Sequence, residues 1–422
     1  MHEFLKYKNF FGLFVILSCC TVQSQSVKAS EYGYDVLDAT PYLLKALYSE
    51  NDTIIIDKQK NDWIVSPLVV RDLKNKVIIL EKGVRLMAKK GSFSNKSDCL
   101  IKLINCSDME IEGNEAILRM NKDEYSDGEW RHGLSILKCR NIKIKNLQIL
   151  NSGGDGIYIN GIEKGSFSKD IVVENVLSKY NKRQGISVIS AENLMVKNAV
   201  FSATSGTLPE CGLDLEPNSE YDRLVNIDFE QCTFSNNNNA GVNISLHNLT
   251  AYSEPVSISF RNCVLLENNV NNSGLASEII ISANKLNPVS GKVIFKDCFF
   301  KDSNYGFLYS RKRSDAFEVV FDNCAAVNIC RGGTMPPVGL EVTDYKNNSS
   351  LGGFTFKGIY LEYDKDIPVI KVRGSRLGTL ESLKDVNGDF TIKNHQIKKY
   401  EHYINYNNNL NRNVKLDYTI IK

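Results

Sequence analysis

The stretch "NIKIKNLQILNSGGDGIYIN", residues 141–160, contains the unit that decides the fold. Apolar and polar residues alternate along it, Asn146 separates two short runs, and a further apolar run follows Gly156. Alternation with a period of two is typical of β-strands, and the spacing of an amphipathic helix is absent. The unit therefore predicts short strands joined by bends.

The same unit recurs along the middle of the chain. Apolar runs that open with a glycine start at Gly133, Gly156, Gly185, Gly212 and Gly241, at spacings of 23, 29, 27 and 29 residues. A repeat of roughly 20–30 residues that carries short strands is the signature of a parallel β-solenoid. We expect an all-β chain in which each coil stacks on its neighbours.

Two further columns support the repeat. Amide or acidic side chains recur at one bend position, which predicts a hydrogen-bonded ladder: Asn146, Asn175, Asn198, Gln231, Asn262, Asp297 and Asn323. Cysteines follow four of these positions by one residue, and we interpret them as buried thiols that act as small apolar side chains: Cys232, Cys263, Cys298 and Cys324.

A helix is predicted before the repeats, around residues 40–50, with Asp38 or Thr40 as its cap and Pro41 in its first turn. Such a helix would close the open end of the solenoid. The helix and the strands after it resemble the entrance of the right-handed parallel β-helix proteins of the pectate lyase and polygalacturonase superfamily. The similarity spans about residues 31–340. We expect one domain over residues 31–422, with less regular coils or a cap from residue 340 onward.

The resemblance also implies a site residue. "SGGDG" is similar to the Asn-Thr-Asp-Gly stretch of polygalacturonases, in which the aspartate is catalytic, and this implies a catalytic Asp155. The next polygalacturonase motif, an Asp-Asp pair, is replaced here by Arg183-Gln184, and the Gly-His-Gly motif is absent.

The first residues predict export. Lys6 and Lys8 precede an apolar run that is too short to span a bilayer and suits a signal peptide over residues 1–24. Residues 16–19 also resemble a bacterial lipobox, which would make Cys19 a lipidated N-terminus and the only membrane attachment. A periplasmic, outer-membrane-anchored or extracellular location follows from these alternatives.

The charge balance limits the partners. The chain has 51 basic and 49 acidic residues. Its sequence contains no dominant basic stripe, which argues against binding to nucleic acid. An acidic polymer remains possible, because a local cleft can be basic. "SRKRSD", residues 310–315, either lines such a groove or forms a solvated loop.

Aligning the glycines places polar side chains in columns on one lateral face. Two residues after each glycine, an outward column contains Ser135, Tyr158, Ser187, Asp214 and Asn243. Just before the glycines lie Arg131, His132, Asp155, Arg183 and Gln184. A shallow polar groove of this kind suits an extended polysaccharide better than a small metabolite.

The segment "PECGLDLEPN", residues 209–218, is the sharpest feature of that face. Asp214 and Glu216 project to the same side of a strand, roughly 6.6–6.8 Å apart along it. Inverting glycosidases hold their two carboxyls about 6.5–9.5 Å apart, so the pair could act as acid and base. Alternatively the two acids are solvated, with Glu216 fixing the turn at Asn218.

"EWRHG", residues 129–133, adds Trp130 for stacking on a sugar, together with Arg131 and His132. Packing of a bend is the structural alternative for this segment. Tyr158 could serve as a base in an eliminating or epimerising enzyme, or be a structural aromatic residue.

Three functions fit these residues. The first is hydrolysis of a polysaccharide without a cofactor, with Asp214, Glu216 and Asp155 as catalytic acids and the remaining groove residues as substrate contacts. The second is a uronic-acid lyase or C5-epimerase, with Tyr158 or His132 as base and Arg131 or Arg183 neutralising the uronate. In that case Asp214, Glu216 and Asn243 would bind Ca²⁺ through oxygen ligands. The third is a glycan-binding solenoid without catalysis.

Overall fold

The computed structural model describes residues 26–270, 277–333, 335–342, 350–374 and 382–421. The predicted signal peptide, with Lys6, Lys8 and the lipidation candidate Cys19, lies outside the described residues. Within the described ranges, no helix has both the length and the apolar character needed to cross a membrane.

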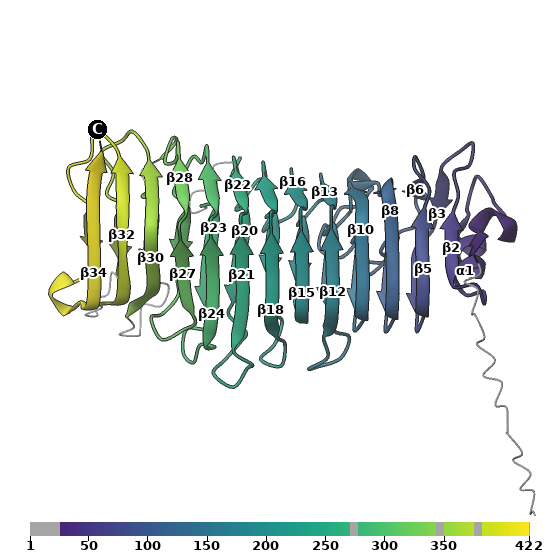
Figure 1. Ribbon diagram of the computed structural model, residues 1–422, viewed down its shortest axis with the longest axis horizontal. Coiled ribbons are helices and arrows are strands. Elements are labelled where there is room, and N and C mark those ends of the chain that lie inside the picture. The colour runs from purple at the N-terminus through teal and green to yellow at the C-terminus, as the bar shows by residue number, and fades with distance from the viewer. Residues whose placement is uncertain (1–25, 271–276, 334, 343–349, 375–381, 422) are drawn as a thin grey trace, which may run out of the picture.

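The chain forms a parallel β-solenoid, and Figure 1 shows its strands stacked side by side along one long axis. All pairings between the named strands are parallel, as the repeat predicts. The strands that follow the repeated glycines belong to a sheet of 12 strands: β4 (Leu68–Arg71), β7 (Ile101–Ile104), β9 (Leu134–Leu137), β11 (Ile157–Asn160), β14 (Ile186–Val188), β17 (Leu213–Leu215), β20 (Val242–Leu246), β23 (Ile279–Ala283), β26 (Leu308–Ser310), β29 (Val338–Glu341), β31 (Ile370–Arg373) and β33 (Glu401–Ile404).

The other strands of each coil form a connected set of 22: β1 (Ser26–Lys28), β2 (Thr53–Ile56), β3 (Trp63–Val65), β5 (Lys74–Leu80), β6 (Arg85–Ala88), β8 (Ser107–Arg119), β10 (Arg140–Leu150), β12 (Ser168–Glu174), β13 (Leu177–Lys179), β15 (Ala191–Lys197), β16 (Val200–Ser202), β18 (Leu224–Glu230), β19 (Thr233–Ser235), β21 (Val256–Arg261), β22 (Val264–Leu266), β24 (Gly291–Lys296), β25 (Phe299–Lys301), β27 (Glu318–Asp322), β28 (Ala325–Val327), β30 (Leu351–Glu362), β32 (Leu383–Lys393) and β34 (Arg412–Ile421). The pattern is weaker in the sequence after residue 340, yet β30, β32 and β34 are among the longest strands.

The bend ladder is confirmed in part: all seven positions have a positive φ, but side-chain hydrogen bonds join only Asn146, Asn175 and Asn198 and, separately, Asp297 and Asn323. Asn146, Asn175 and Asn198 have φ values of 52°, 55° and 49°, in the left-handed region that Asn tolerates better than most residues. The Asn198 Nδ2 donates to Asn175 Oδ1 at 2.6 Å, and Asn175 Nδ2 donates to Asn146 Oδ1 at 2.9 Å. Each amide therefore fixes the register of the next coil.

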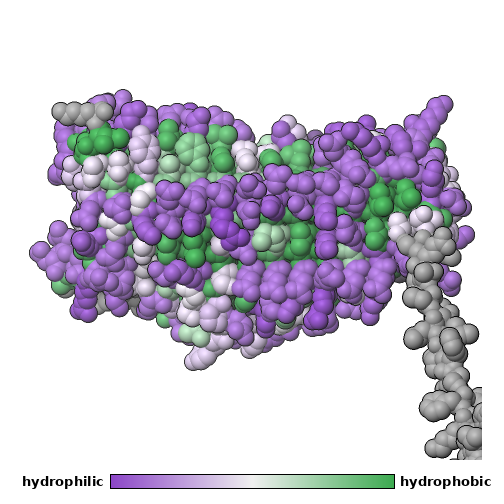
Figure 2. Space-filling model, in the orientation of Figure 1, coloured by the Kyte–Doolittle hydropathy of each residue, from purple (hydrophilic) through white to green (hydrophobic). Residues whose placement is uncertain are grey.

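The core repeats in the same way. Phe229, Phe260, Phe295 and Phe321 stack with ring centroids 5.1, 4.5 and 4.8 Å apart. The predicted thiol column is also confirmed, since its four cysteines are free and buried. The outer surface carries rows of hydrophilic side chains that run along the axis, as Figure 2 shows.

Among the residues that the structure describes, one α-helix precedes the repeats. It spans α1 (Thr40–Leu47) and is shorter than expected, because the chain turns after Tyr48 to enter β2. Pro41 lies in the first turn, as predicted, and the apolar Leu43 and Leu47 are buried. The helix lies beside β2 in Figure 1, and its capping function stays a prediction. Short 3₁₀ helices occur at η1 (Ala29–Tyr32), η2 (Lys122–Glu124) and η3 (Asn408–Leu410).

The ladder makes a stability prediction. Asn175→Ala should lower the free energy of unfolding by ~1–3 kcal/mol, because alanine disfavours a positive φ and loses both amide hydrogen bonds. Asn175→Gly should lose less, since glycine adopts this conformation without strain. Urea denaturation of both variants checks this, and equal stability of the alanine variant and the wild type would contradict it.

Candidate active site

Arg183 is the centre of the candidate site. It lies just before β14, and only 13% of its side chain is exposed. Its guanidinium lies 3.7 Å from Asp155 Oδ1, 4.0 Å from Asp214 Oδ2 and 3.1 Å from Glu216 Oε2. Burial alone would lower the Arg183 pKa, but the three carboxyl groups raise it above its ordinary value. One largely covered cation thus contacts carboxyl groups from neighbouring coils, and we call these four residues the carboxylate cluster.

The strand register confirms the predicted column, but four of its five side chains are buried rather than exposed: Ser135, Tyr158, Ser187 and Asp214. Tyr158 pairs with Ser187, Ser187 with Asp214, and Asp214 with Asn243. The bends before the glycines bring Asp155 and Arg183 to the same place. Because equivalent positions of adjacent coils are about 4.8 Å apart, residues distant in sequence become direct neighbours.

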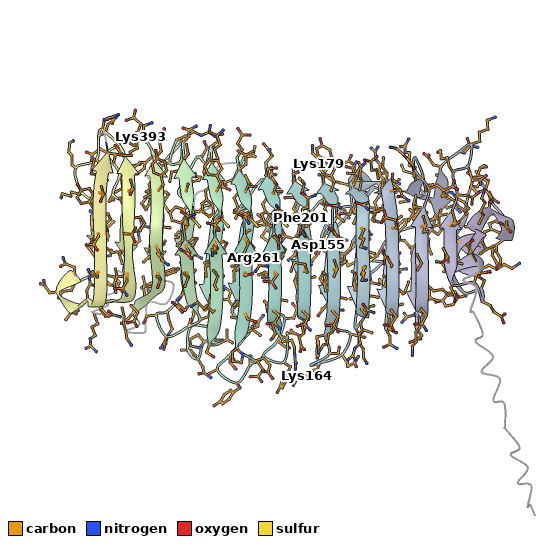
Figure 3. The ribbon with its side chains drawn as sticks, viewed as in Figure 1. Asp155, Lys164, Lys179, Phe201, Arg261 and Lys393 are labelled. Carbon is orange, nitrogen blue, oxygen red and sulfur yellow. The ribbon has the colours of Figure 1, made fainter. Side chains whose placement is uncertain are left out.

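Asp155 is fully buried among the middle coils, where Figure 3 labels it. Neither carboxyl oxygen accepts a hydrogen bond with normal geometry. Burial raises the pKa of Asp155 to about 7, although Arg183 and Ser187 act in the opposite direction. A carboxyl group with this pKa can release and regain a proton near neutral pH.

Asp214 is equally buried but is held by two amides. Gln184 Nε2 donates to its Oδ2 at 2.7 Å, and Asn243 Nδ2 donates to its Oδ1 at 2.9 Å. Burial and the nearby Glu216 raise the pKa of Asp214 well above its ordinary range, against the effect of Arg183. Both oxygens of this carboxyl group are therefore engaged.

Glu216 is the accessible member of the carboxylate cluster. It follows β17, and 39% of its side chain is exposed. Arg183 Nη2 donates to its Oε2 at 3.1 Å. Asp214 and Glu216 thus both approach Arg183, as two outward positions on one strand should.

His132 and Tyr158 flank Asp155. Their rings stack with centroids 4.4 Å apart, and the backbone N–H of Asp155 donates to His132 Nδ1 at 3.1 Å. Burial and the positive charges of Arg183 and Lys102 lower the His132 pKa to about 3, so the imidazole is neutral.

Tyr158 is also buried, and its hydroxyl accepts from Asn160 Nδ2 at 2.9 Å. Burial raises the Tyr158 pKa to about 12, while hydrogen bonds from Asn160 and Asn218 act to lower it. Asn218 therefore lies beside Tyr158, at the edge of the predicted groove.

For Arg131, the contacts favour the structural alternative over a substrate contact. Its Nε donates to the Phe93 carbonyl at 2.9 Å, its Nη2 to the Ser94 carbonyl at 3.2 Å, and its Nη1 pairs with Asp127 at 2.6 Å. The guanidinium is buried and holds a loop, so we assign it a structural role. The neighbouring Trp130 is 42% exposed and available for contact.

Sequence reasoning missed the segment between β8 and β9, which crosses several coils. Lys122 Nζ donates to Ser205 Oγ at 3.0 Å, and Lys182 Nζ donates to the Tyr125 carbonyl. The 14 residues between Arg119 and Leu134 were the available signal, because most bends in the repeat are much shorter. This segment, residues 120–133, contributes to the burial around Asp155.

No family model matches the chain. The uncharacterised prophage-derived protein YorA of Bacillus subtilis is 27% identical over 172 residues, which is 37% of this chain and 28% of YorA. The uncharacterised protein YclG of the same organism is 24% identical over 160 residues, which is 34% of this chain and 27% of YclG. The aligned parts thus span less than a third of either relative.

Solved structures share the fold. A tailspike protein of E. coli bacteriophage HK620, in complex with a pentasaccharide, has a TM-score of 0.61 at 12% identity, covering 93% of this chain and 80% of the tailspike chain. The catalytic unit of a GH87 α-1,3-glucanase from Streptomyces thermodiastaticus has a TM-score of 0.59 at 13% identity, covering 94% and 68%. The A-module of the mannuronan C-5 epimerase AlgE6 from Azotobacter vinelandii has a TM-score of 0.54 at 12% identity, covering 94% and 99%. These similarities confirm the β-helix fold.

Removing the central cation should destabilise the protein. Above about pH 7, Arg183→Gln should lower the free energy of unfolding by ~3–5 kcal/mol, because buried carboxyl groups that ionise there would lack their counter-charge. Thermal or urea unfolding measures the loss. Arg140→Gln, at an exposed position of β10, is the matched control. Equal effects of the two substitutions would contradict the central position of Arg183.

The pKa of Asp155 predicts the direction of the pH dependence. The folded protein binds this proton up to about pH 7, whereas an unfolded aspartate releases it near pH 4, so stability should fall as the pH rises between these values. Asp155→Asn should flatten that slope, and the exposed control Glu254→Gln should leave it unchanged. Melting temperatures from pH 4 to pH 8 test this. Equal slopes for Asp155→Asn and wild type would refute the raised pKa.

Proposed function

We propose that this protein is a carbohydrate-active enzyme that hydrolyses glycosidic bonds of a polysaccharide at the carboxylate cluster. The observation that carries the proposal is the grouping of three carboxyl groups around Arg183, two of them fully buried and one accessible. Glycoside hydrolysis requires one protonated and one ionised carboxyl group near the scissile bond. Environments that push two carboxyl pKa values apart supply that pair.

The environments suggest a role for each carboxyl group. Asp155 has a pKa of about 7 and is suited to donate a proton to the leaving oxygen. Glu216 is accessible and paired with Arg183, which suits a base or nucleophile. Asp214 is fixed by Gln184 and Asn243 and positions the cluster. The sequence suggested Asp214 and Glu216 as the couple, whereas the hydrogen bonds favour Asp155 with Glu216.

A polysaccharide would lie along the 12-stranded sheet. Trp130 offers an exposed ring, and Tyr158 and Asn218 border the cluster. Asp155 and Asp214 are covered in this structure, so contact with a substrate requires movement of the side chains around them, including Arg183. The proposal includes export through the signal peptide expected in residues 1–24.

The lyase or epimerase alternative has less support from the contacts. Asn243 directs its amide nitrogen, a donor, at Asp214, and Arg183 holds Glu216. Ca²⁺ binding by these three residues would require Asn243 to rotate and would compete with Arg183, because Ca²⁺ takes oxygen ligands. His132 already accepts a hydrogen bond at Nδ1 and is a poor candidate base.

A binding protein without catalysis remains the second candidate, and one observation favours it. Asp155 and Asp214 have no exposed surface, as in a cluster that serves only to hold neighbouring coils together. The structure of the HK620 tailspike protein, which has a similar fold, contains a bound pentasaccharide, so a β-helix surface can bind a glycan.

Incubation with a panel of polysaccharides distinguishes these functions. New reducing ends without ultraviolet absorbance of an unsaturated product support hydrolysis. Unsaturated product that disappears with EDTA would instead establish a calcium-dependent lyase. Binding without turnover of any glycan would establish the binding protein.

Substitutions test the roles within the cluster. Asp155→Asn, Asp214→Asn and Glu216→Gln should each lower kcat at least about a hundredfold, as expected for loss of a general acid or base or its support. The exposed control Glu254→Gln should retain full activity. Wild-type activity should also fall as the pH rises through about 7, where Asp155 loses its proton. Unchanged turnover in the Asp155 and Glu216 variants would remove the cluster from the mechanism.

A further inference from the structure

The 12-stranded sheet continues well beyond the carboxylate cluster, and its outward positions form two rows. One row runs from Asp214 through Asn243, Ile280, Tyr309 and Gly339 to Lys371. The second row lies two residues further along each coil and contains Glu216, Ser245, Ser282, Arg311, Glu341 and Arg373. The rows therefore connect the cluster to a second group of charged residues.

That second group carries an excess of positive charge. Arg311, Lys371 and Arg373, which we call the cationic cluster, surround the single carboxylate of Glu341. Arg373 Nη1 lies 3.8 Å from Glu341 Oε1. Arg311 and Lys371 form no ion pair with any residue that the structure describes. Burial and the neighbouring Arg373 lower the Lys371 pKa, an effect that a bound anion would reverse.

Within the cationic cluster, Arg311 is held in place rather than free in solvent. Arg311 Nε donates to the Tyr309 hydroxyl at 3.0 Å, and that hydroxyl donates to Glu341. The Arg311 guanidinium also lies 5.2 Å from the centre of the Tyr309 ring. Tyr309 itself is buried, so it forms a rigid support. Prior ordering of this kind lowers the entropy cost of binding a ligand.

Two rows of aligned side chains join the two clusters. The charges of both clusters affect the pKa of His247. Burial lowers this pKa most, Arg311 lowers it further, and Glu216 raises it. Between the clusters the rows offer only small or neutral side chains, including Ser245 and Ser282. From Asp214 the first row takes three coil steps to Tyr309 and five to Lys371, or about 14 and 24 Å at about 4.8 Å per coil. Only an extended ligand spans this distance.

We propose that the cationic cluster is a binding site for the carboxylate or sulfate groups of an anionic polysaccharide that extends along the sheet from Glu216. The inference rests on the proposed function for the presence of a polysaccharide, and it adds the charge of that substrate. Guanidinium groups bind carboxylate and sulfate oxygens with two parallel hydrogen bonds.

The proposal also gives a role to one residue of the basic run at residues 310–315. Arg311 belongs to the cationic cluster, whereas Lys312 is buried and Arg313 pairs with Asp315.

The test measures polymer binding to variants in a Glu216→Gln background, which limits turnover. The probes are polygalacturonate, dextran sulfate and neutral dextran, titrated by calorimetry at low and high salt. We expect at least one anionic polymer to bind at least tenfold more tightly than dextran at low salt. The triple variant Arg311→Gln/Lys371→Gln/Arg373→Gln should lose at least tenfold of that affinity, and Lys371→Gln alone a smaller part.

A matched control removes the same charge elsewhere. Lys143→Gln/Lys296→Gln/Lys415→Gln changes three exposed lysines on the 22-stranded side and should bind within twofold of the parent. If the parent protein binds polygalacturonate but not dextran sulfate, the site is specific for carboxylate groups. If it binds dextran sulfate but not polygalacturonate, the site is specific for sulfate groups. Equal losses in the two triple variants, or equal binding of dextran and both polyanions, would overturn the proposal.

Failure of the anion site and failure of the proposed hydrolase activity give different experimental results. If the triple variant loses anion binding but the wild type hydrolyses no glycan, the anion site stands and the hydrolase fails. If the wild type hydrolyses a neutral glycan and the triple variant does so equally well, the hydrolase stands and the anion site fails. Urea denaturation of the triple variant shows whether a loss of binding reflects unfolding.

Discussion

The hydrogen-bonded stacking of one coil on the next is the constraint on which everything else depends. Parallel pairing sets the spacing, and the left-handed bend at Asn146, Asn175 and Asn198 sets the register. Because a slip by one residue would turn every core side chain outward, the register also protects the phenylalanine stack. A side chain's place on the surface is thus determined by its position within the repeat.

This constraint explains how charged groups come to be buried together. Asp155, Arg183 and Asp214 belong to different coils, and stacking brings them within contact of one another. Burying several carboxyl groups beside one guanidinium is unfavourable for stability, since only one of the charges is compensated fully. Such an arrangement is common at sites where proton transfer needs a shifted pKa.

Much of the fold could be predicted because the repeat is visible in the sequence. The spacing of the glycines located the outward column, and Tyr158 and Asp214 lie in it as expected. The degree of burial of individual side chains could not be predicted in the same way. The segment across residues 120–133 has no counterpart in the repeat, so neither the inward turn of Arg131 nor the full burial of Asp155 follows from periodicity. Which amides engage Asp214 depends on rotamers that a pattern of residue types does not specify.

The stack of coils also fixes distances along the molecule in equal steps. Each coil adds one step of about 4.8 Å between the carboxylate cluster and the cationic cluster, and the strands of each coil pair only with those of adjacent coils. The separation of the two clusters can therefore change only in whole steps, by gain or loss of complete coils. A duplication within β20 to β23 would lengthen the binding face by one unit while leaving both end groups intact. The distance between the two clusters is thus set by the number of repeats that the gene encodes.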